Sequence, residues 1–136
     1  MKSLAVDDDL TTRLIMEQTL SHFGEVDQCA DGAAAVEMST HALEGGHPYD
    51  VICLDIMMPN MSGLEALNLI RHAEQSRGLV PAHAAKVIIM TGADDSDTIR
   101  QAFKELCDAY VVKPIDPAEL LNIVYCLCPV SAGDPV

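Results

Sequence analysis

The sequence is poor in positive charge. Its 136 residues include 8 lysines and arginines against 21 aspartates and glutamates, which gives a formal net charge of −13 at pH 7. A surface of this sign repels the phosphates of DNA, RNA and anionic lipids. Direct binding of nucleic acid is therefore not expected.

Long apolar segments are absent as well. The start of the chain, residues 1–6, meets three aspartates before the apolar core of a signal peptide could form. No later run approaches the roughly 20 apolar residues that a membrane-spanning helix needs. These two absences predict a cytoplasmic protein with no membrane insertion.

Spacings typical of common metal and nucleotide sites are missing too. The five cysteines are scattered, with Cys126 and Cys128 as the one close pair, so reduced thiols are expected rather than a disulfide framework or a zinc site. The five histidines stand singly, and surface positions are expected for them. Neither a Gly-x-x-x-x-Gly-Lys-Ser/Thr phosphate loop nor a Gly-x-Gly-x-x-Gly fingerprint occurs, which leaves nucleotide binding without support.

The chain does contain enough apolar residues for one folded domain. Apolar residues make up 49% of the sequence and charged residues 21%, so burial can offset the entropy of ordering the chain. A length of 136 residues fits a single domain. We predict one domain over residues 1–128 and a frayed C-terminal tail over residues 129–136.

Short apolar runs alternate with helical segments in five rounds. The predicted strands are Lys2 to Val6, Glu25 to Cys29, Asp50 to Leu54, Lys86 to Met90 and Ala109 to Val112. Three apolar runs in them, residues 51–54, 87–90 and 110–112, show no alternation with polar residues, which is typical of strands covered on both faces.

Helices are predicted between the strands from apolar residues at i, i+4, i+7 spacing. Such stripes occur at Met16, Leu20 and Phe23, at Ile99, Phe103 and Leu106, and at Leu120, Val124 and Leu127. Ser62 and Asp116 each stand three residues before a glutamate, the pattern of a helix N-cap. Loops are expected at residues 45–48 and 77–81, the second with a helical turn.

This order predicts an α/β fold, a (βα)5 doubly wound five-stranded parallel sheet with helices on both faces. Ligands of such sheets bind outside the carboxyl ends of the strands. The residues that leave those ends are Asp7, Asp8 and Asp9, then Asp55, then Thr91 and Gly92, and then Lys113 and Pro114. Four separate segments therefore deliver polar groups to one edge of the sheet.

These groups suit the transfer of a phosphoryl group. Gathered carboxylates raise one another's pKa unless a cation lies among them, and oxygen ligands without histidine favour Mg²⁺. A threonine hydroxyl and a lysine ammonium beside that ion suit a phosphoryl group, whose charge spreads over three oxygens. Asp55 is then the natural nucleophile.

Each residue also has a structural explanation when it is taken alone. Asp9 could be only a helix N-cap, Thr91 with Gly92 a turn, and Lys113 a solvated side chain. The combination favours the functional interpretation, because independent turns have no reason to place these groups at successive positions of one edge.

Four motifs frame these residues: Val6-Asp7-Asp8, Leu54-Asp55-Ile56-Met57-Met58-Pro59-Asn60-Met61-Ser62-Gly63, Met90-Thr91-Gly92 and Tyr110-Val111-Val112-Lys113-Pro114. In this combination the chain resembles the receiver domain of bacterial two-component response regulators, in its stand-alone, chemotaxis-type form, over roughly Ser3 to Leu127. The resemblance implies a flavodoxin-like fold with strand order 2-1-3-4-5 and a phosphoacceptor module of a phosphorelay.

The resemblance also implies roles for the acids. Asp55 would take the phosphoryl group from a histidine kinase or a histidine phosphotransfer protein. Asp8 would bind Mg²⁺ directly and Asp7 partly through water. Asp55 and the backbone carbonyl of Met57 would complete the protein's share of the ion's ligands.

A conformational switch is implied in the same way. Lys113 would pair with the phosphoryl oxygens, and Thr91 would hydrogen-bond them and move, while Tyr110 turns inward. The surface of the fourth helix, fifth strand and fifth helix would then bind a downstream protein. The bond between Lys113 and Pro114 is a cis peptide in the family.

Two alternative functions and two departures from the family pattern stay open at this point. A phosphatase that uses an aspartyl-phosphate intermediate would carry a second aspartate two residues after the nucleophile, where Met57 stands, so we do not expect a turnover enzyme. A docking module could keep the fold without using the chemistry. Gly92 replaces an alanine that many relatives carry, and residues 71–85 are longer than the family usually needs.

Overall fold

The computed structural model describes residues 1–58, 60–92, 101, 104 and 106–128. The predicted tail, residues 129–136, and most of the predicted fourth helix, residues 99–106, lie outside the described residues. In chain order, the described elements are β1 (Lys2–Val6), α1 (Leu10–Leu20), η1 (Ser21–Phe23), β2 (Glu25–Cys29), α2 (Gly32–Glu44), β3 (Val51–Asp55), α3 (Gly63–Ser76), η2 (Pro81–His83), β4 (Lys86–Thr91), β5 (Ala109–Val112) and α5 (Pro117–Leu127).

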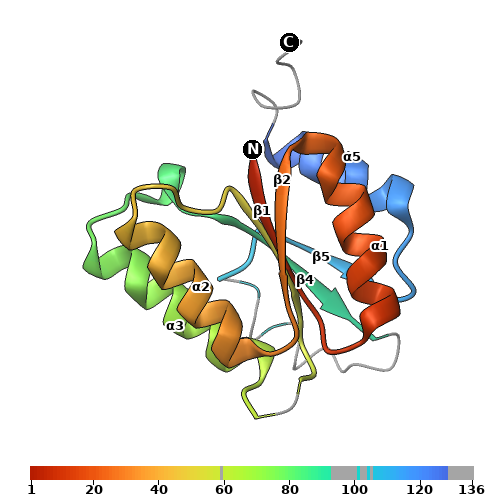
Figure 1. Ribbon diagram of the computed structural model, residues 1–136, viewed down its shortest axis with the longest axis horizontal. Helices are drawn as coiled ribbons and strands as arrows, with labels where there is room; N and C mark the ends of the chain where they lie inside the picture. The colour runs from red at the N-terminus through yellow and green to blue at the C-terminus, as the bar shows by residue number, and fades with distance from the viewer. Residues whose placement is uncertain (59, 93–100, 102–103, 105, 129–136) are drawn as a thin grey trace.

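The five strands form one parallel sheet in the order β2-β1-β3-β4-β5. Helices α2 and α3 cover one face of this sheet, and α1 and α5 cover the other (Figure 1). The predicted α/β, doubly wound, flavodoxin-like sheet with order 2-1-3-4-5 is therefore confirmed.

The predicted strand positions are confirmed to within one residue. β3 runs from Val51 to Asp55, one residue later than the predicted Asp50 to Leu54. β4 continues through Thr91, whose carbonyl accepts a hydrogen bond of 2.7 Å from the N–H of Lys113.

The strands differ in how well they are covered. All five residues of β3 are buried, as the continuous apolar run predicts. The same prediction for β5 was wrong, since Tyr110 is 54% exposed and Val112 is 38% exposed. β5 lies at the edge of the sheet, where Val111 alone of these three side chains enters the core.

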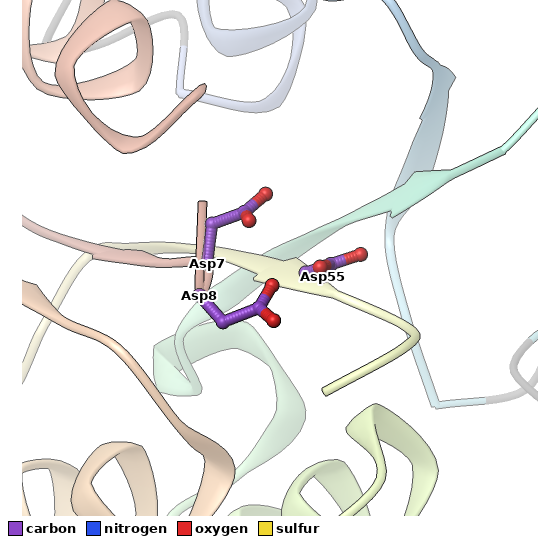
Figure 2. Close-up of side chains that lie close together, drawn as sticks. All are labelled: Asp7, Asp8 and Asp55. Carbon is purple, nitrogen blue, oxygen red and sulfur yellow. The ribbon is translucent and has the colours of Figure 1, made fainter. Parts of the chain in front are cut away.

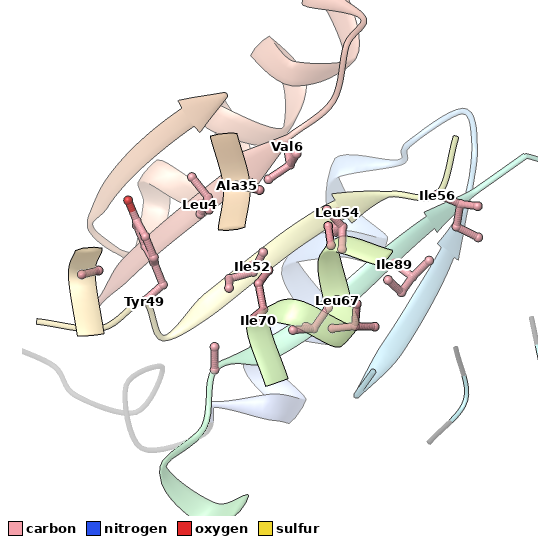
Figure 3. Packing of buried hydrophobic residues seen from close by; sticks show 14 residues of the cluster. Leu4, Val6, Ala35, Tyr49, Ile52, Leu54, Ile56, Leu67, Ile70 and Ile89 are labelled. Carbon is pink, nitrogen blue, oxygen red and sulfur yellow. The ribbon is translucent and has the colours of Figure 1, made fainter. Parts of the chain in front are cut away.

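Two apolar cores lie on the two faces of the sheet. The core under α2 and α3 includes Leu4, Val6, Ile52, Leu54, Ile89, Leu67 and Ile70 (Figure 3). The core under α1 and α5 includes Ala5, Cys53, Met90, Met16, Leu20, Leu120 and Val124. Successive residues of a strand thus enter opposite cores, and each large buried side chain stabilises the fold by roughly 1.5–3 kcal/mol.

The helices begin at side chains that cap their first N–H groups. The hydroxyl of Ser62 and the carboxylate of Asp116 accept hydrogen bonds from the backbones of α3 and α5, as predicted. Asp9 and Asp31 do the same for α1 and α2. Each cap typically contributes about 1 kcal/mol and fixes where its helix leaves the preceding loop.

The connection between α3 and β4 contains the predicted helical turn, η2. Arg71 of α3 holds this region: its Nη1 donates to Oε1 of Glu74 and to the carbonyl of Ala85, both at 2.8 Å, and its Nε donates to the carbonyl of Leu106 at 2.9 Å. The buried carboxylate of Glu74 also accepts a hydrogen bond of 2.8 Å from the N–H of Ala85. Side-chain hydrogen bonds thus hold both ends of residues 71–85 together.

The remaining surface predictions agree with the structure. All five cysteines are free thiols, and all five histidines are exposed.

The peptide bond between Lys113 and Pro114 is cis, as the resemblance implied. None of the helices in the described residues has both the length and the apolar character that crossing a membrane requires.

Candidate functional site

Three carboxylates meet at the carboxyl edge of the sheet (Figure 2). Asp7 and Asp8 follow β1, Asp55 is the last residue of β3, and one oxygen of each lies within 4.8 Å of the other two. Because Val6 pairs with Leu54 across the two parallel strands, the residues that follow leave both strands at the same level. The structure therefore brings these three predicted site residues together.

Lys113, which follows β5, reaches the same cluster from the other side. Its ammonium nitrogen lies 3.0 Å from Oδ2 of Asp7 and 3.2 Å from Oδ1 of Asp55. Burial opposes the charged ammonium, but these two carboxylates raise the pKa of Lys113 above its ordinary value. The side chain is therefore a fixed positive charge beside both carboxylates at neutral pH.

Asp55 lies in an environment that disfavours its negative charge. Burial, and then the nearby charge of Asp7, raise the pKa of Asp55 to about 6, although Lys113 and the N–H of Met57 act in the opposite direction. The side chain of Asp55 is only 6% exposed. A cation at the cluster would relieve this cost.

The donor set fits a hydrated divalent cation. Asp7 is fully buried, and its Oδ1 accepts a hydrogen bond of 2.8 Å from the N–H of Asp9. Its Oδ2 is also buried and lies 3.0 Å from the ammonium of Lys113. Asp8 is exposed to solvent. Three carboxylates that meet beside the Lys113 ammonium, one of them facing solvent, suit Mg²⁺, which takes oxygen ligands and keeps several waters.

Met57 stands beside Asp55 at the mouth of the site. Its backbone N–H donates to Oδ1 of Asp55 at 3.4 Å, and its side chain is 65% exposed. The thioether has no titratable proton, so Met57 brings no second acid or base to the site.

The two predicted switch residues, Thr91 and Tyr110, lie on neighbouring strands. Thr91 is buried, and its hydroxyl donates to the carbonyl of Val111 at 3.5 Å. Tyr110 precedes Val111 in β5 and is more than half exposed. The hydroxyl of Thr91 is thus directed to β5 rather than hydrogen-bonded to the acid cluster.

Asp9 is a helix N-cap, the structural role that the sequence also allowed for it. Its Oδ2 accepts hydrogen bonds from the N–H of Thr12 at 3.0 Å and from the hydroxyl of Thr12 at 2.6 Å. Asp9 therefore caps α1, and the acid cluster consists of Asp7, Asp8 and Asp55.

Sequence reasoning missed two residues that shape the site. Arg13 donates a hydrogen bond of 2.9 Å to the backbone carbonyl of Asp7. Gly63, which had been noted as part of a helix start and of the acceptor motif but without a role in the site, lies so close to β3 that an added Cβ would be 2.5 Å from the carbonyl oxygen of Asp55. A basic residue one turn into the helix after the acids was the available signal for the first, and a glycine inside the acceptor motif for the second.

Residues 4–125 match the family model of the response regulator receiver domain. The chain belongs to this family. The resemblance seen in the sequence motifs is thereby confirmed, and the phosphoacceptor hypothesis is favoured over the phosphatase and docking alternatives.

Known relatives agree with this assignment. Probable histidine kinase 2 of Oryza sativa subsp. indica is 31% identical over 138 residues, which cover 94% of this chain and 13% of that protein. The structure of chemotaxis protein CheY4 from Vibrio cholerae is 29% identical, with a TM-score of 0.75 and coverage of 93% of this chain and 97% of that one. The receiver domain of histidine kinase CKI1 from Arabidopsis thaliana, complexed with Mg²⁺ and BeF₃⁻, is 29% identical, with a TM-score of 0.76 and coverage of 93% and 88%.

Membership of the receiver family defines the function at a coarse level. The chain is a phosphoacceptor module of two-component signalling, and receiver domains interact with histidine kinases or phosphotransfer proteins. Such a module is a signalling element rather than a classical turnover enzyme. The chain spans only 13% of the length of the rice kinase, so the activity of that whole protein is not carried over to it.

Proposed function

We propose that Asp55 is the phosphoacceptor of this receiver domain. The observation that carries the proposal is the position of the Lys113 ammonium, 3.2 Å from Oδ1 of Asp55. Asp55 also has the Met57 N–H at 3.4 Å, so a positive charge and a backbone donor face its carboxylate. Asp7 has the same two kinds of partner, the Lys113 ammonium at 3.0 Å and the N–H of Asp9 at 2.8 Å, but its side chain is 0% exposed against 6% for Asp55, so it is less accessible to a phosphodonor.

The proposed step is an in-line transfer from a phosphohistidine of a histidine kinase or a histidine phosphotransfer protein. A carboxylate oxygen of Asp55 attacks phosphorus, and an O–P bond forms while the N–P bond to the imidazole breaks. The imidazole leaves and takes up a proton from solvent. The ammonium of Lys113 stabilises the negative charge on the phosphoryl oxygens during the transfer.

Asp7, Asp8 and Asp55, with the backbone carbonyl of Met57, are proposed to hold Mg²⁺. The proximity of the three carboxylates, two of which share the single positive charge of Lys113, supports this assignment. When bound, the ion neutralises charge on the phosphoryl oxygens. The same chemistry allows the domain to phosphorylate itself from small phosphodonors and to lose the group slowly.

Phosphorylation is proposed to act as a switch through Thr91 and Tyr110. The hydroxyl of Thr91 would leave Val111 and hydrogen-bond the phosphoryl group, and the exposed ring of Tyr110 would turn inward. A phosphoryl group adds about −1.5 to −2 charges, which is enough to bias such a packing change. The surface that responds would include the predicted fourth helix, β5 and α5, and would bind a downstream protein.

The extent and location of the protein remain predictions. We propose a receiver domain over residues 1–128, a range that includes residues 4–125 matched by the family model. The proposed cytoplasmic location rests on the sequence alone.

The intact mass after incubation with Mg²⁺ and acetyl phosphate tests the proposed acceptor. The wild-type chain should gain the mass of one phosphoryl group, and Asp55→Asn should gain none. Asp116→Asn is the matched control, because asparagine caps a helix as well as aspartate does and Asp116 lies in the cap of α5. The proposal is wrong if the wild type gains no mass or if Asp55→Asn gains as much as the wild type.

A further inference from the structure

Arg13 binds the backbone of the acid cluster rather than its carboxylates. The side chain is half-buried on α1, and its Nη1 donates to the backbone carbonyl of Asp7 at 2.9 Å. Its Nε donates to Oε1 of Gln28 at 3.2 Å, at the end of β2. The guanidinium thus bridges α1, β2 and the turn that carries two of the three acids.

The same turn is pinned at several other points. The N–H of Asp7 donates to the carbonyl of Cys29 at 3.3 Å, and the N–H of Asp9 donates to Oδ1 of Asp7 at 2.8 Å. The N–H of Arg13 donates to the carbonyl of Asp9 at 3.0 Å as α1 begins. Asp8 lies between these fixed residues, so the placement of its exposed carboxylate follows from the geometry of the turn.

We infer that Arg13 is a positioning residue for the divalent-cation site, and that it acts by holding the carbonyl of Asp7 so that Asp7 and Asp8 face Asp55. This inference rests on the proposed function, because it takes the acid cluster as the site of Mg²⁺. The hydrogen bond goes to the backbone carbonyl of Asp7, so Arg13 itself occupies no carboxylate oxygen of the cluster. Groups that hold the ligands of a metal commonly change its affinity by 10- to 100-fold.

Removal of Arg13 has two opposed consequences for a bound cation. The loss of a positive charge beside the cluster favours the cation, because like charges repel. The loss of the hydrogen bond frees the turn, so binding must then order the carboxylates, which weakens it. The sign of the change in affinity therefore separates a positioning role from a purely electrostatic one.

The deciding experiment is a calorimetric titration of Mg²⁺ into the full chain without any phosphodonor. The dissociation constant should rise about tenfold in Arg13→Met relative to the wild type. An unchanged or lower dissociation constant overturns the inference. Arg77→Met, which removes a positive charge from the exposed end of α3, is the matched control and should leave the constant unchanged.

Two further variants cover the case in which Arg13→Met does not fold. Gln28→Ala keeps the charge of Arg13 and removes one of its two anchors, and should raise the dissociation constant about two- to threefold. Arg13→Lys also keeps the charge but cannot make both hydrogen bonds, and should give a constant between those of the wild type and Arg13→Met. Constants equal to that of the wild type in both variants overturn the inference.

The dependence of phosphorylation on Mg²⁺ gives a second readout. In Arg13→Met, the Mg²⁺ concentration that gives half the maximal rate should rise, while the rate at saturating Mg²⁺ is retained. A fall in the saturating rate with no change in that concentration contradicts the inference. A wild-type chain that binds no Mg²⁺ removes the proposed metal site as well, whereas normal wild-type binding with an unaffected variant removes only the role of Arg13.

Discussion

At the scale of single residues, the negative charge of Asp55, which the proposed phosphoryl transfer requires, destabilises the folded protein. Its pKa is raised to about 6 by burial and by Asp7, so the folded, metal-free protein holds a proton there that the unfolded chain releases at lower pH. Stability therefore falls as pH rises from about 4, the ordinary carboxyl value, to about 6. The protein is expected to be less stable at neutral pH without a cation than at mildly acidic pH, as far as this group is concerned.

The variant Asp55→Asn tests this cost directly. In the presence of a chelator at neutral pH, it should be more stable than the wild type by roughly 1–3 kcal/mol, because the amide carries no charge to bury. The difference should shrink at about pH 4.5, where Asp55 is protonated. Urea unfolding at the two pH values measures it, and a variant less stable than the wild type at neutral pH would contradict the explanation.

Lys113 is expected to couple phosphorylation to the switch rather than to hold the cation. Lys113→Ala removes a positive charge next to the carboxylates of Asp7 and Asp55, so binding of Mg²⁺ should not weaken. It also removes the ion pair that forms with the phosphoryl group, so that group should no longer shift Thr91 and Tyr110. Amide NMR spectra with Mg²⁺ and beryllofluoride test both points, and a wild-type set of shifts in the variant would rule out the coupling role.

At the scale of secondary-structure elements, the first residue of α3 packs in close contact with the end of β3, the strand that carries Asp55. Gly63, the first residue of α3, donates its N–H to the carbonyl of Ile56 at 2.8 Å. An added Cβ would be 2.5 Å from the carbonyl oxygen of Asp55 and 2.9 Å from Cα of Ile56. A glycine is therefore required by this close approach.

Gly63→Ala should push the end of β3 out of place. The expected loss of stability is about 1–3 kcal/mol, with slower phosphorylation of Asp55 by acetyl phosphate. Gly45→Ala is the matched control, because the nearest atom to its added Cβ is the carbonyl oxygen of His41 at an ordinary 3.5 Å. Equal urea midpoints and equal phosphorylation rates for the two variants would show that the close approach has no effect.

Arg71 performs a similar anchoring task at the other end of α3. Besides Glu74, Ala85 and Leu106, its guanidinium lies 3.2 Å from Oδ2 of Asp108, which also accepts the N–H of Val87 at 2.8 Å. The residues before β4 and before β5 are thus tied to one side chain.

Arg71→Met should cost about 3–5 kcal/mol, because the buried carboxylate of Glu74 would lose its cation. Arg77→Met is the control: its ion pair with Glu44 spans 3.3 Å between side chains that are 44% and 54% exposed, and its loss should cost less than about 1 kcal/mol. Urea unfolding compares the two, and similar losses would contradict a structural role for Arg71.

Buried elements and strand-end residues were the parts of the molecule that the sequence predicted well. β3 and β4 are covered on both faces, so they appear in the sequence as unbroken apolar runs, and parallel pairing brings the residues after them to one edge. The exposure of Tyr110 was missed because an apolar run does not reveal that its strand lies at an edge. Arg13 and Arg71 were missed because a long side chain that reaches a distant backbone carbonyl leaves no local pattern.

At the scale of the whole molecule, one end of the sheet carries the candidate site and the other end contributes stability. The carboxyl end carries the acids and Lys113. The amino end is closed by hydrogen bonds and ring contacts: the hydroxyl of Tyr49 donates to Asp27 at 2.6 Å, and the ammonium of Lys2 lies 4.7 Å from the centre of the Tyr49 ring. These contacts stabilise the fold at a distance from the site. They can therefore offset the repulsion among the carboxylates of the metal-free protein.

The most direct test of the central claim is to locate the phosphoryl group. The chain is phosphorylated with acetyl phosphate and Mg²⁺, the acyl phosphate is reduced with borohydride, and the peptides are sequenced by mass spectrometry. The reduced residue should be Asp55, and the modification should disappear when the metal is chelated. Modification of the peptide that holds Asp7 and Asp8, or an equal yield without metal, would contradict the account.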